Sequence, residues 1–293
     1  QFREFSHFIE IYVAIVKCFK TPEDIELIAR EFLKGQAEQN IVYSEVTYSA
    51  YTQYENHQLS FPDQFAALQR ANDWAKAELG VSMGIVVDLV RDIPPEPGLE
   101  TAEWFIKYRT PMQVAFGLGG SEIGHPPEKH QAAFQKILAE GDIPIVPHAG
   151  ETGGAESIWS AIHVCKAVRI GHGVRCIEDE ALVDYLREHQ IPLEVSPVSN
   201  VCLGVADSIP DHPIQQLIDA GLVVTVNSDD PPMFNTTLTN EFVVCADAFG
   251  WDTAMLKQLT YNAVDVSFLS DDKKAALRRD FEKQFTELEE QLA

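Results

Sequence analysis

Residues suited to metal-assisted hydrolysis gather at a few points of this 293-residue chain, each directly after an apolar or β-branched run. His148 is followed by Glu151, His172 stands between two glycines, and the pair Asp229-Asp230 follows a third run. A neutral imidazole and a carboxylate are donors that suit Zn²⁺, and a nearby glutamate can move protons. Because zinc lowers the pKa of a bound water to about 7, the set predicts a hydrolytic metal centre.

These residues need a scaffold that brings the ends of distant strands together. Short apolar runs alternate with helical patterns along the chain, which is typical of βαβ units around a parallel sheet. Several runs are almost continuously apolar, as expected for strands that are covered on both faces. The sequence predicts seven strands, at residues 42–48, 82–89, 114–118, 143–148, 167–171, 193–196 and 222–228.

The helices between these strands have clear start and stop signals. Thr21-Pro22-Glu23-Asp24 supplies an N-cap, a proline in the first turn and two acids, and Gly80, Gly141 and Gly221 each end a helical pattern. The periodicity predicts helices at residues 8–20, from 21 onward, and at 62–79, 127–140, 156–166, 179–189 and 213–220.

Seven strand–helix units favour an α/β fold of the TIM-like (β/α)8 barrel type, which needs eight strands. Segment 8–20 is predicted to be helical, so we expect the first strand to precede Gln1. A doubly wound sheet is the alternative, but its marker G-x-G-x-x-G is absent after the early strands. We expect residues 1–293 to form a single, N-terminally incomplete barrel domain, with the polar clusters at its C-terminal rim.

Together, these clusters resemble the motifs of the adenosine deaminase family, and the resemblance extends over essentially the whole chain. Any one motif is weak evidence, but their co-occurrence in one order is specific. The resemblance implies a hydrolase that uses one zinc ion per subunit to deaminate C6 of a 6-aminopurine nucleoside, such as adenosine to inosine. The matching segments are Gly120-Ser121-Glu122, His148-Ala149-Gly150-Glu151, Gly171-His172-Gly173, Pro197-Val198-Ser199-Asn200 and Ser228-Asp229-Asp230-Pro231.

The resemblance also implies roles for individual residues. His148 and Asp229 would be zinc ligands. Glu151 would protonate purine N1 and so make C6 electrophilic. His172 would orient the attacking water and accept or stabilise its proton.

Two further residues would bind the purine. By the same resemblance, Asp230 would hydrogen-bond N7 and the backbone N–H of Gly120 would meet N3. Glu45 and Asp88 lie on predicted strands and could point into the site, but we expect structural roles for both. The remaining histidines have no polar companions and are expected on the surface or on helices; they are His7, His57, His125, His130, His163, His189 and His212.

One departure from the family pattern concerns the metal ligands. The family has a His-x-His pair at the end of its first strand, and this sequence contains no such pair. Only His148 and Asp229 are then present as ligands. The strand count and the missing pair together lead us to expect that an N-terminal segment precedes Gln1. The fragment alone is expected to bind zinc weakly and to turn over slowly.

Other substrates remain open within the family. Adenine deaminases tend to place aspartate before the second histidine, where this chain has Gly171, which favours a nucleoside. The segments Gly119-Gly120-Ser121-Glu122 and Asp229-Asp230-Pro231-Pro232-Met233-Phe234 also resemble enzymes that act on aminodeoxyfutalosine, a 6-aminopurine nucleoside.

Other classes of protein fit the sequence less well. Binuclear amidohydrolases commonly need a carboxylated lysine on the strand at 114–118, which has none, and the H-x-E and P-C-x-x-C motifs of cytidine-type deaminases are absent. A non-catalytic purine-binding barrel is the alternative if the N-terminal histidines are truly missing.

Composition limits the partners. The formal charge of −23 repels phosphate backbones, so we expect a small-molecule substrate and no nucleic acid. No apolar run reaches the ~18 residues of a membrane span. The five cysteines form no C-x-x-C pair and are expected to be reduced thiols in a cytoplasmic protein.

Overall fold

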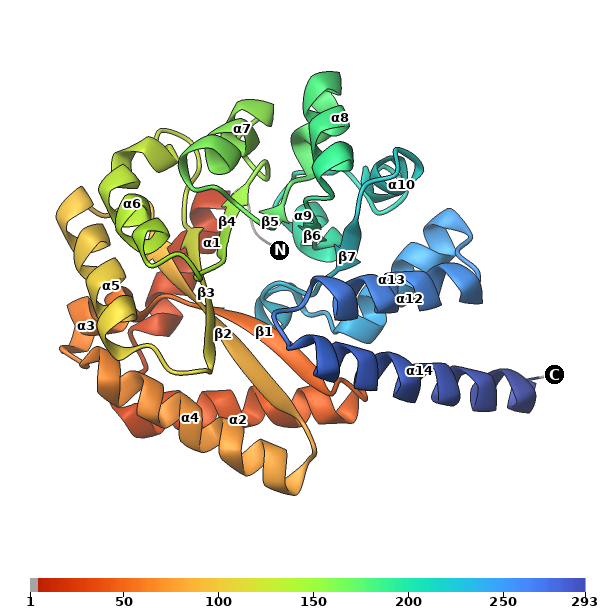
Figure 1. The fold of residues 1–293 in the computed structure, drawn as a ribbon, viewed down its shortest axis with the longest axis horizontal. Coiled ribbons are helices and arrows are strands. Elements are labelled where there is room, and N and C mark those ends of the chain that lie inside the picture. The colour runs from red at the N-terminus through yellow and green to blue at the C-terminus, as the bar shows by residue number, and fades with distance from the viewer. Residues whose placement is uncertain (1–4, 293) are drawn as a thin grey trace.

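The computed structural model describes residues 5–292. Its sheet has seven parallel strands in the order β1-β2-β3-β4-β5-β6-β7, so each strand pairs with its neighbours in sequence. Figure 1 shows the strands turning around a common centre with helices outside them, which confirms the predicted barrel-type architecture. The strands are β1 Tyr43–Tyr48, β2 Ser82–Val90, β3 Gln113–Gly119, β4 Ile145–Ala149, β5 Ile170–His172, β6 Leu193–Val195 and β7 Val224–Val226.

Helices connect successive strands and cover the outside of the sheet. Those before and between the first strands are α1 Phe5–Val16, α2 Pro22–Glu38, α3 Ala50–His57, α4 Phe61–Glu78, α5 Pro95–Tyr108, η1 Pro127–His130 and α6 Gln131–Ala139. Those that follow are α7 Ala155–Val164, η2 Val174–Glu178, α8 Glu180–His189, α9 Pro197–Cys202, α10 Ile214–Asp219, α11 Pro231–Phe234, α12 Leu238–Phe249, α13 Thr253–Val266 and α14 Asp271–Leu292.

The alternation of strand side chains divides the interior from the helix layer. On β2, Val87 and Leu89 pack in the core between sheet and helices. Val86 packs inside the curl with side chains of β3 and β4, and Asp88 lines the cavity on the same face. Because successive side chains of a strand point to opposite faces, β2 contributes side chains both to the core and to the cavity lining.

The seven strands do not close into a ring in residues 5–292, since β1 and β7 pair only with β2 and β6. An ion cluster spans part of the interior instead. Arg169, just before β5, is 2.6 Å from Glu45 of β1 and 2.7 Å from Glu194 of β6, and donates to the Val266 carbonyl at 2.8 Å. These contacts tie β1 to the opposite side of the curled sheet.

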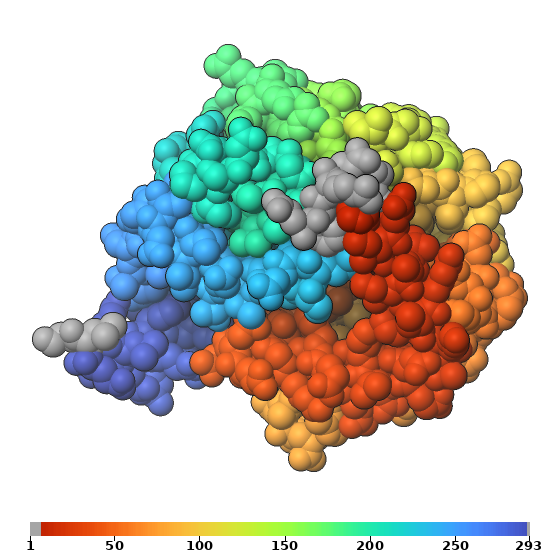
Figure 2. Space-filling view, turned by 180° about the vertical axis from the view of Figure 1, so that it is seen from behind, coloured from red at the N-terminus to blue at the C-terminus, as the bar shows by residue number. Residues whose placement is uncertain are grey.

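Helix α1 lies over the open end of the barrel. Phe8 stacks on Phe234 with ring centroids 5.3 Å apart, next to the buried Leu203. Figure 2 shows α1 in red on this face, close to the light-blue segment that follows β7. At the other end of the chain, α14 projects away from the body (Figure 1). None of the helices in the described part of the chain has the length and apolar character that crossing a membrane requires.

Candidate active site

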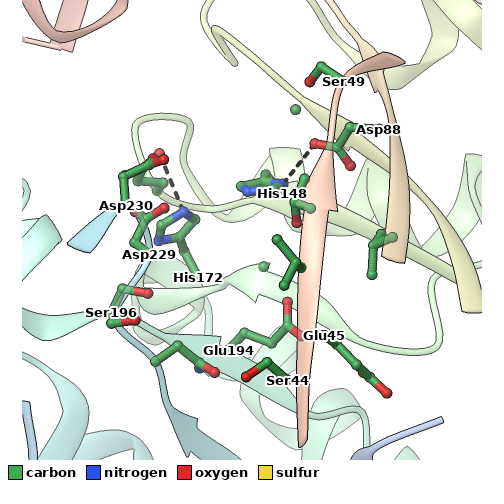
Figure 3. Close-up of a pocket in the computed structure, with 18 of the residues that line it drawn as sticks. Ser44, Glu45, Ser49, Asp88, His148, His172, Glu194, Ser196, Asp229 and Asp230 are labelled. Carbon is green, nitrogen blue, oxygen red and sulfur yellow. Dashed lines mark ion pairs between the residues drawn. The ribbon is translucent and has the colours of Figure 1, made fainter. Parts of the chain in front are cut away.

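A cavity of about 480 Å³ opens at the C-terminal ends of the strands and is partly covered by α1. Its lining brings together all six residues for which the sequence predicts a role in the site: Gly120, His148, Glu151, His172, Asp229 and Asp230. Figure 3 shows His148, His172, Asp229 and Asp230 facing this cavity, and they come from the ends of β4, β5 and β7. Residues up to 110 positions apart in the chain therefore meet at one rim, as the barrel hypothesis requires.

His148 is held by contacts to one of its ring nitrogens. Its Nδ1 lies 3.1 Å from the Leu118 carbonyl oxygen and 3.8 Å from the Asp88 carboxylate. Both neighbours are acceptors, so Nδ1 carries the proton and Nε2 has a free lone pair. His148 is thus in the tautomer that a metal ligand needs, and a carboxylate stands behind it, as is usual for metal-bound histidines.

Asp88 fits behind His148 because two residues of β3 have no side chain. A Cβ at Gly117 would lie 1.9 Å from Asp88 Oδ1, and one at Gly119 would lie 2.3 Å from Oδ2. Asp88 is 2% exposed, and its Oδ1 has no hydrogen-bond partner among the described residues. Burial raises the pKa of Asp88 to about 6, although His148 and Arg91 oppose this. Its proximity to His148 was not predicted.

His172 reaches the cavity through an unusual backbone conformation. In a regular strand the His172 side chain would point to the same face as that of Ile170, which packs in the helix-side core. However, its φ of 62° is left-handed and breaks the alternation. Non-glycine residues seldom adopt this region, and such strain concentrates at functional sites. The buried ring lies with Nε2 3.7 Å from Glu151 Oε2, and its centroid is 5.4 Å from that of His148.

Glu151 lies on a loop that a second glutamate holds in place. Glu122 accepts hydrogen bonds from the successive backbone N–H groups of Gly150, Glu151, Thr152 and Gly153. Burial alone would raise the pKa of Glu122, but the Gly153 N–H and the charge of Arg91 outweigh it and keep the pKa below its usual value. An ionised Glu122 can serve all four donors, so it fixes the backbone from which the Glu151 side chain extends.

The environment of the Glu151 side chain favours the protonated carboxyl. It is 6% exposed, and its Oε1 has no hydrogen-bond partner within the described chain. Burial, with Asp229 and Glu122 adding to it, raises the pKa of Glu151 well above its ordinary value. A raised pKa favours the protonated carboxyl, which can donate a proton to a bound molecule.

The paired aspartates follow β7 in a turn. Asp229 has a φ of 53° and accepts a hydrogen bond from the Ser199 hydroxyl at 2.7 Å. Burial and the neighbouring Asp229 raise the pKa of Asp230 well above its ordinary value. Tyr12 of α1 lies close enough that burial and the charge of Asp230 raise its pKa. Both aspartates line the cavity, Asp229 with an exposed side chain and Asp230 half-buried.

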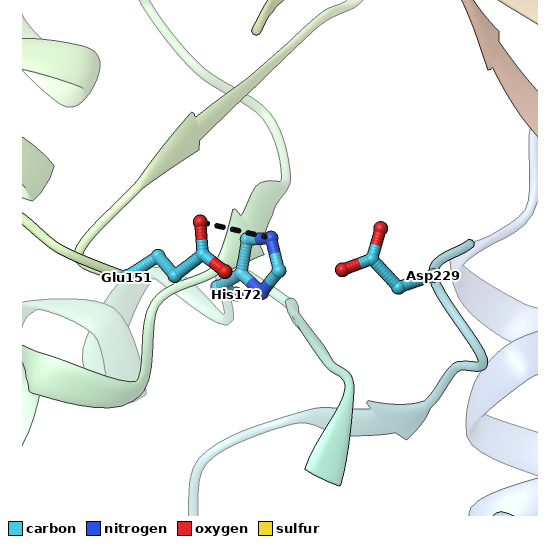
Figure 4. Close-up of side chains that lie close together, drawn as sticks. All are labelled: Glu151, His172 and Asp229. Atoms are coloured by element: carbon cyan, nitrogen blue, oxygen red, sulfur yellow. Dashed lines mark ion pairs between the residues drawn. The ribbon is translucent and has the colours of Figure 1, made fainter. Parts of the chain in front are cut away.

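The donor set fits a divalent cation. Ligand atoms of Glu151, His172 and Asp229 lie within 4.8 Å of one another (Figure 4). This cluster contains Asp229, one of the two predicted ligands, together with the two residues predicted to transfer protons. The other predicted ligand, His148, lies outside it but presents Nε2 to the same cavity. Carboxyl and imidazole groups gathered in one cavity are the chemistry that a cation would stabilise.

Gly120 lies where β3 leaves the sheet. It lines the cavity with a φ of 99°, and a Cβ there would meet Asp92 Oδ2 at 2.8 Å. The next residue, Ser121, donates its backbone N–H to the same Asp92 oxygen at 3.3 Å. A glycine is needed here for the left-handed turn and for close approach of a ligand to the backbone.

Two of the histidines expected on the surface or on helices are buried. His212 is 2% exposed and contacts Asn200, while His130 is 1% exposed and contacts the Arg91 carbonyl. His130 lies at the end of η1, so the expectation of a helical position holds for it. His212 lies neither on the surface nor on a helix, so the expectation was wrong for this residue, because its ring bonds polar groups inside the fold. Asn200 and Glu122 belonged to segments that resembled the family, but their contacts could not be derived from sequence.

Comparisons with known proteins agree with this geometry. The family model for adenosine deaminase matches residues 1–284. The chain is 39% identical over 284 residues to the aminodeoxyfutalosine deaminase of Streptomyces avermitilis, covering 94% of this chain and 77% of that protein. It is 36% identical over 277 residues to the adenine deaminase of Crocosphaera subtropica, covering 94% and 84%. The crystal structure of an adenine deaminase from Arthrobacter aurescens superposes with a TM-score of 0.92 at 28% identity, covering 97% and 86%.

The motifs, the barrel scaffold and these matches lead to one assignment. Hydrolytic release of an amino group from a purine is the chemistry shared by the matched proteins, and the cavity holds the carboxyl and imidazole groups that such a reaction needs. The chain therefore belongs to the adenosine deaminase family and is a hydrolase that acts on the C–N bond of an aminopurine.

Proposed function

We propose that this protein hydrolyses the C6 amino group of a 6-aminopurine nucleoside, giving the 6-oxopurine and ammonia. The observation that carries the proposal is Glu151, a buried carboxyl with a raised pKa and an unpartnered oxygen, beside His172 and within reach of Asp229. Attack of water on a heteroaromatic carbon needs a proton on the ring and a strong nucleophile at once. These groups, clustered in one cavity, would supply both.

Glu151 acts as the acid in this proposal. It gives its proton to purine N1, which makes C6 electrophilic. Water adds to C6 as hydroxide, and the proton it loses passes to Glu151, which has given its own proton to N1. The C6–N bond then breaks, and the amino group takes the proton of the C6 hydroxyl and leaves as ammonia, so that the product carries oxygen at C6 and hydrogen at N1.

Asp230 and Gly120 orient the base. Purine N7 has a lone pair and no hydrogen, so a hydrogen bond from Asp230 requires the protonated carboxyl that its raised pKa favours. The Gly120 N–H would meet N3 on the other edge of the ring. Together with Glu151 at N1, the two contacts fix the ring in its plane and place C6 near His172.

His148 and Asp229 would hold one zinc ion. Zinc at that position would supply a Lewis acid that lowers the pKa of the attacking water. The free lone pair on His148 Nε2 and the carboxylate of Asp229 are suitable donors. Both also lie in the segments that resemble the family's ligand motifs.

Among nucleosides, the relatives favour aminodeoxyfutalosine over adenosine, since the 39% identical protein has that substrate in its name. Adenine is the second candidate, supported by relatives named adenine deaminase at 34–36% identity. Gly171, where adenine deaminases tend to have aspartate, favours the nucleoside.

A direct assay separates these candidates. Zinc-reconstituted protein is mixed with aminodeoxyfutalosine, adenosine and adenine in turn, and ammonia release is measured with the absorbance change of the purine. We expect the highest kcat/KM with a nucleoside, and with aminodeoxyfutalosine before adenosine. A higher kcat/KM for adenine would replace the nucleoside proposal, and absence of ammonia from all three would refute the proposed function.

A further inference from the structure

A chain of buried hydrogen bonds leads from a backbone amide to His172. The Ile214 N–H donates to His212 Nδ1 at 3.1 Å, and His212 Nε2 lies 3.0 Å from Asn200 Oδ1. The Asn200 amide nitrogen lies 3.4 Å from His172 Nδ1. All three side chains are at most 4% exposed. The chain starts at a group whose donor character cannot change, because a peptide N–H only donates.

Each link in this chain fixes the next. Since His212 Nδ1 accepts from Ile214, the proton of the neutral ring is on Nε2, which donates to Asn200 Oδ1. Burial, and the proximity of His172, lower the pKa of His212 to about 4, so the ring is neutral near pH 7. The opposite orientation of Asn200 would place its NH₂ against the His212 N–H, donor against donor. Asn200 therefore presents N–H to His172.

We propose that Ile214, His212 and Asn200 hold His172 in the tautomer with its proton on Nε2, so that this imidazole acts as a hydrogen-bond donor in the cavity. The proposal deepens the proposed function, on which it rests. Nδ1 has its lone pair engaged by Asn200, and Nε2–H points toward Glu151. In this state, neutral His172 has no free lone pair with which to take a proton from water.

This chain of hydrogen bonds from Ile214 through His212 and Asn200 to His172, which we call the relay, also distinguishes between two possible arrangements of the metal ligands. Glu151, His172 and Asp229 lie close enough to form a metal site by themselves. A protonated Nε2 cannot bind a metal, and Nδ1 faces Asn200. His148 has the opposite tautomer, with Nδ1 protonated and Nε2 free. Of the two neighbouring imidazoles, His148 is therefore the ligand and His172 is the donor.

Asn200 is rigid enough for this role. Its backbone N–H donates to Ser196 at 3.0 Å, and its carbonyl accepts from Val205 at 2.8 Å and from Ala206 at 3.2 Å. Its side chain is fully buried, so water does not compete for the amide. Asn200 and His212 are positioning residues, because they act through His172.

The tautomer can be observed directly. Protein labelled with [¹⁵N]histidine and loaded with zinc is studied by long-range ¹H–¹⁵N NMR, with His172 assigned by comparison with His172→Gln. We expect a protonated Nε2 and an unprotonated Nδ1 at pH 7. A His172 with its proton on Nδ1, or with both nitrogens protonated, would overturn the proposal.

Substitution of Asn200 reverses the relay. In Asn200→Asp, the carboxylate accepts from both rings and draws the proton of His172 to Nδ1. Because the wrong tautomer of a catalytic imidazole is very costly in rate, we expect kcat to fall by at least about 100-fold. His212→Ala is the second variant; it frees Asn200 to rotate, so both tautomers should be seen.

Asn72→Asp is the matched control. Asn72 also binds backbone groups through its amide, at Met83, but it is remote from the cavity lining. We expect it to lower stability and to leave the His172 spectrum and kcat unchanged. If Asn200→Asp keeps the Nε2–H spectrum and wild-type kcat, the relay is refuted. If the wild type deaminates no aminopurine, the proposed function is wrong. The NMR spectrum of His172 then still shows whether the relay sets its tautomer.

Discussion

The Asp88 carboxylate lies 3.8 Å from His148 Nδ1, in a space that Gly117 and Gly119 leave free on the neighbouring strand. Asp88 pairs in register with Gly117, so a side chain at position 117 and the carboxylate of Asp88 cannot both occupy this space. A buried anion at this distance strengthens the imidazole as an electron-pair donor through its other nitrogen.

We expect Asp88→Asn to weaken zinc binding roughly 10- to 100-fold, because the negative charge behind His148 is lost. Competition with a chromogenic chelator gives the Kd. Val87→Ala is the control, since Val87 lies next to Asp88 but packs in the helix-side core. It should lower the unfolding temperature and leave the zinc Kd unchanged. Equal zinc affinity of Asp88→Asn and wild type would show that Asp88 is only structural.

Glu151→Gln and His148→Ala should separate acid from ligand. Glu151→Gln removes the proton donor, so we expect kcat to fall by about 10³-fold or more with zinc content near wild type. His148→Ala should lose both zinc and activity. Metal analysis by mass spectrometry with steady-state kinetics measures both. Loss of zinc from Glu151→Gln would instead place the metal on Glu151, His172 and Asp229.

Glu122→Gln should loosen the loop that carries Glu151. The amide NH₂ of glutamine would face backbone N–H groups, leaving buried donors unsatisfied at a cost of about 2–4 kcal/mol in unfolding free energy. Chemical denaturation and kcat are the measurements. Glu156→Gln is the control, because Glu156 accepts from Gly154 on the same loop but lies farther along the chain. Similar kcat values for both variants would contradict the positioning role of Glu122.

The protein should become less stable in acid, because protonation of the buried His212 favours the unfolded chain. The unfolded chain protonates this ring near pH 6.5, but the folded protein does so only near pH 4, with His172 as the neighbouring titratable group. Stability from His212 is therefore present above pH 6.5 and is lost as the pH falls toward 4, by roughly 3 kcal/mol. Denaturation from pH 7.5 to 4.5 should show wild type and His212→Gln converging. A constant difference between them would contradict the lowered pKa.

The strand positions followed well from the sequence, because continuous apolar runs ended by polar clusters describe buried parallel strands. The run at 82–89 corresponds to β2 Ser82–Val90. The run at 167–171 was less accurate, since β5 pairs only over Ile170–His172. Helix α5 was not predicted: Pro94-Pro95-Glu96-Pro97-Gly98 is typical of a loop, yet prolines are tolerated in a helix's first turn.

The six predicted site residues share one cavity because barrel topology alone brings strand ends together. The residues that support them depend on contacts that sequence cannot reveal. Asp88 approaches His148 only because two glycines face it, and His212 reaches Asn200 from a separate loop. Their residue types are ordinary for a strand and a loop, so no local pattern distinguishes them.

The four N–H groups bound by Glu122 have a consequence for how the reaction begins. A loop fixed during folding does not have to be ordered when a substrate arrives, so the entropic penalty for placing Glu151, the acid in the proposed function, is met before the encounter. Binding free energy that would otherwise go into arranging this loop remains for recognition of the purine itself.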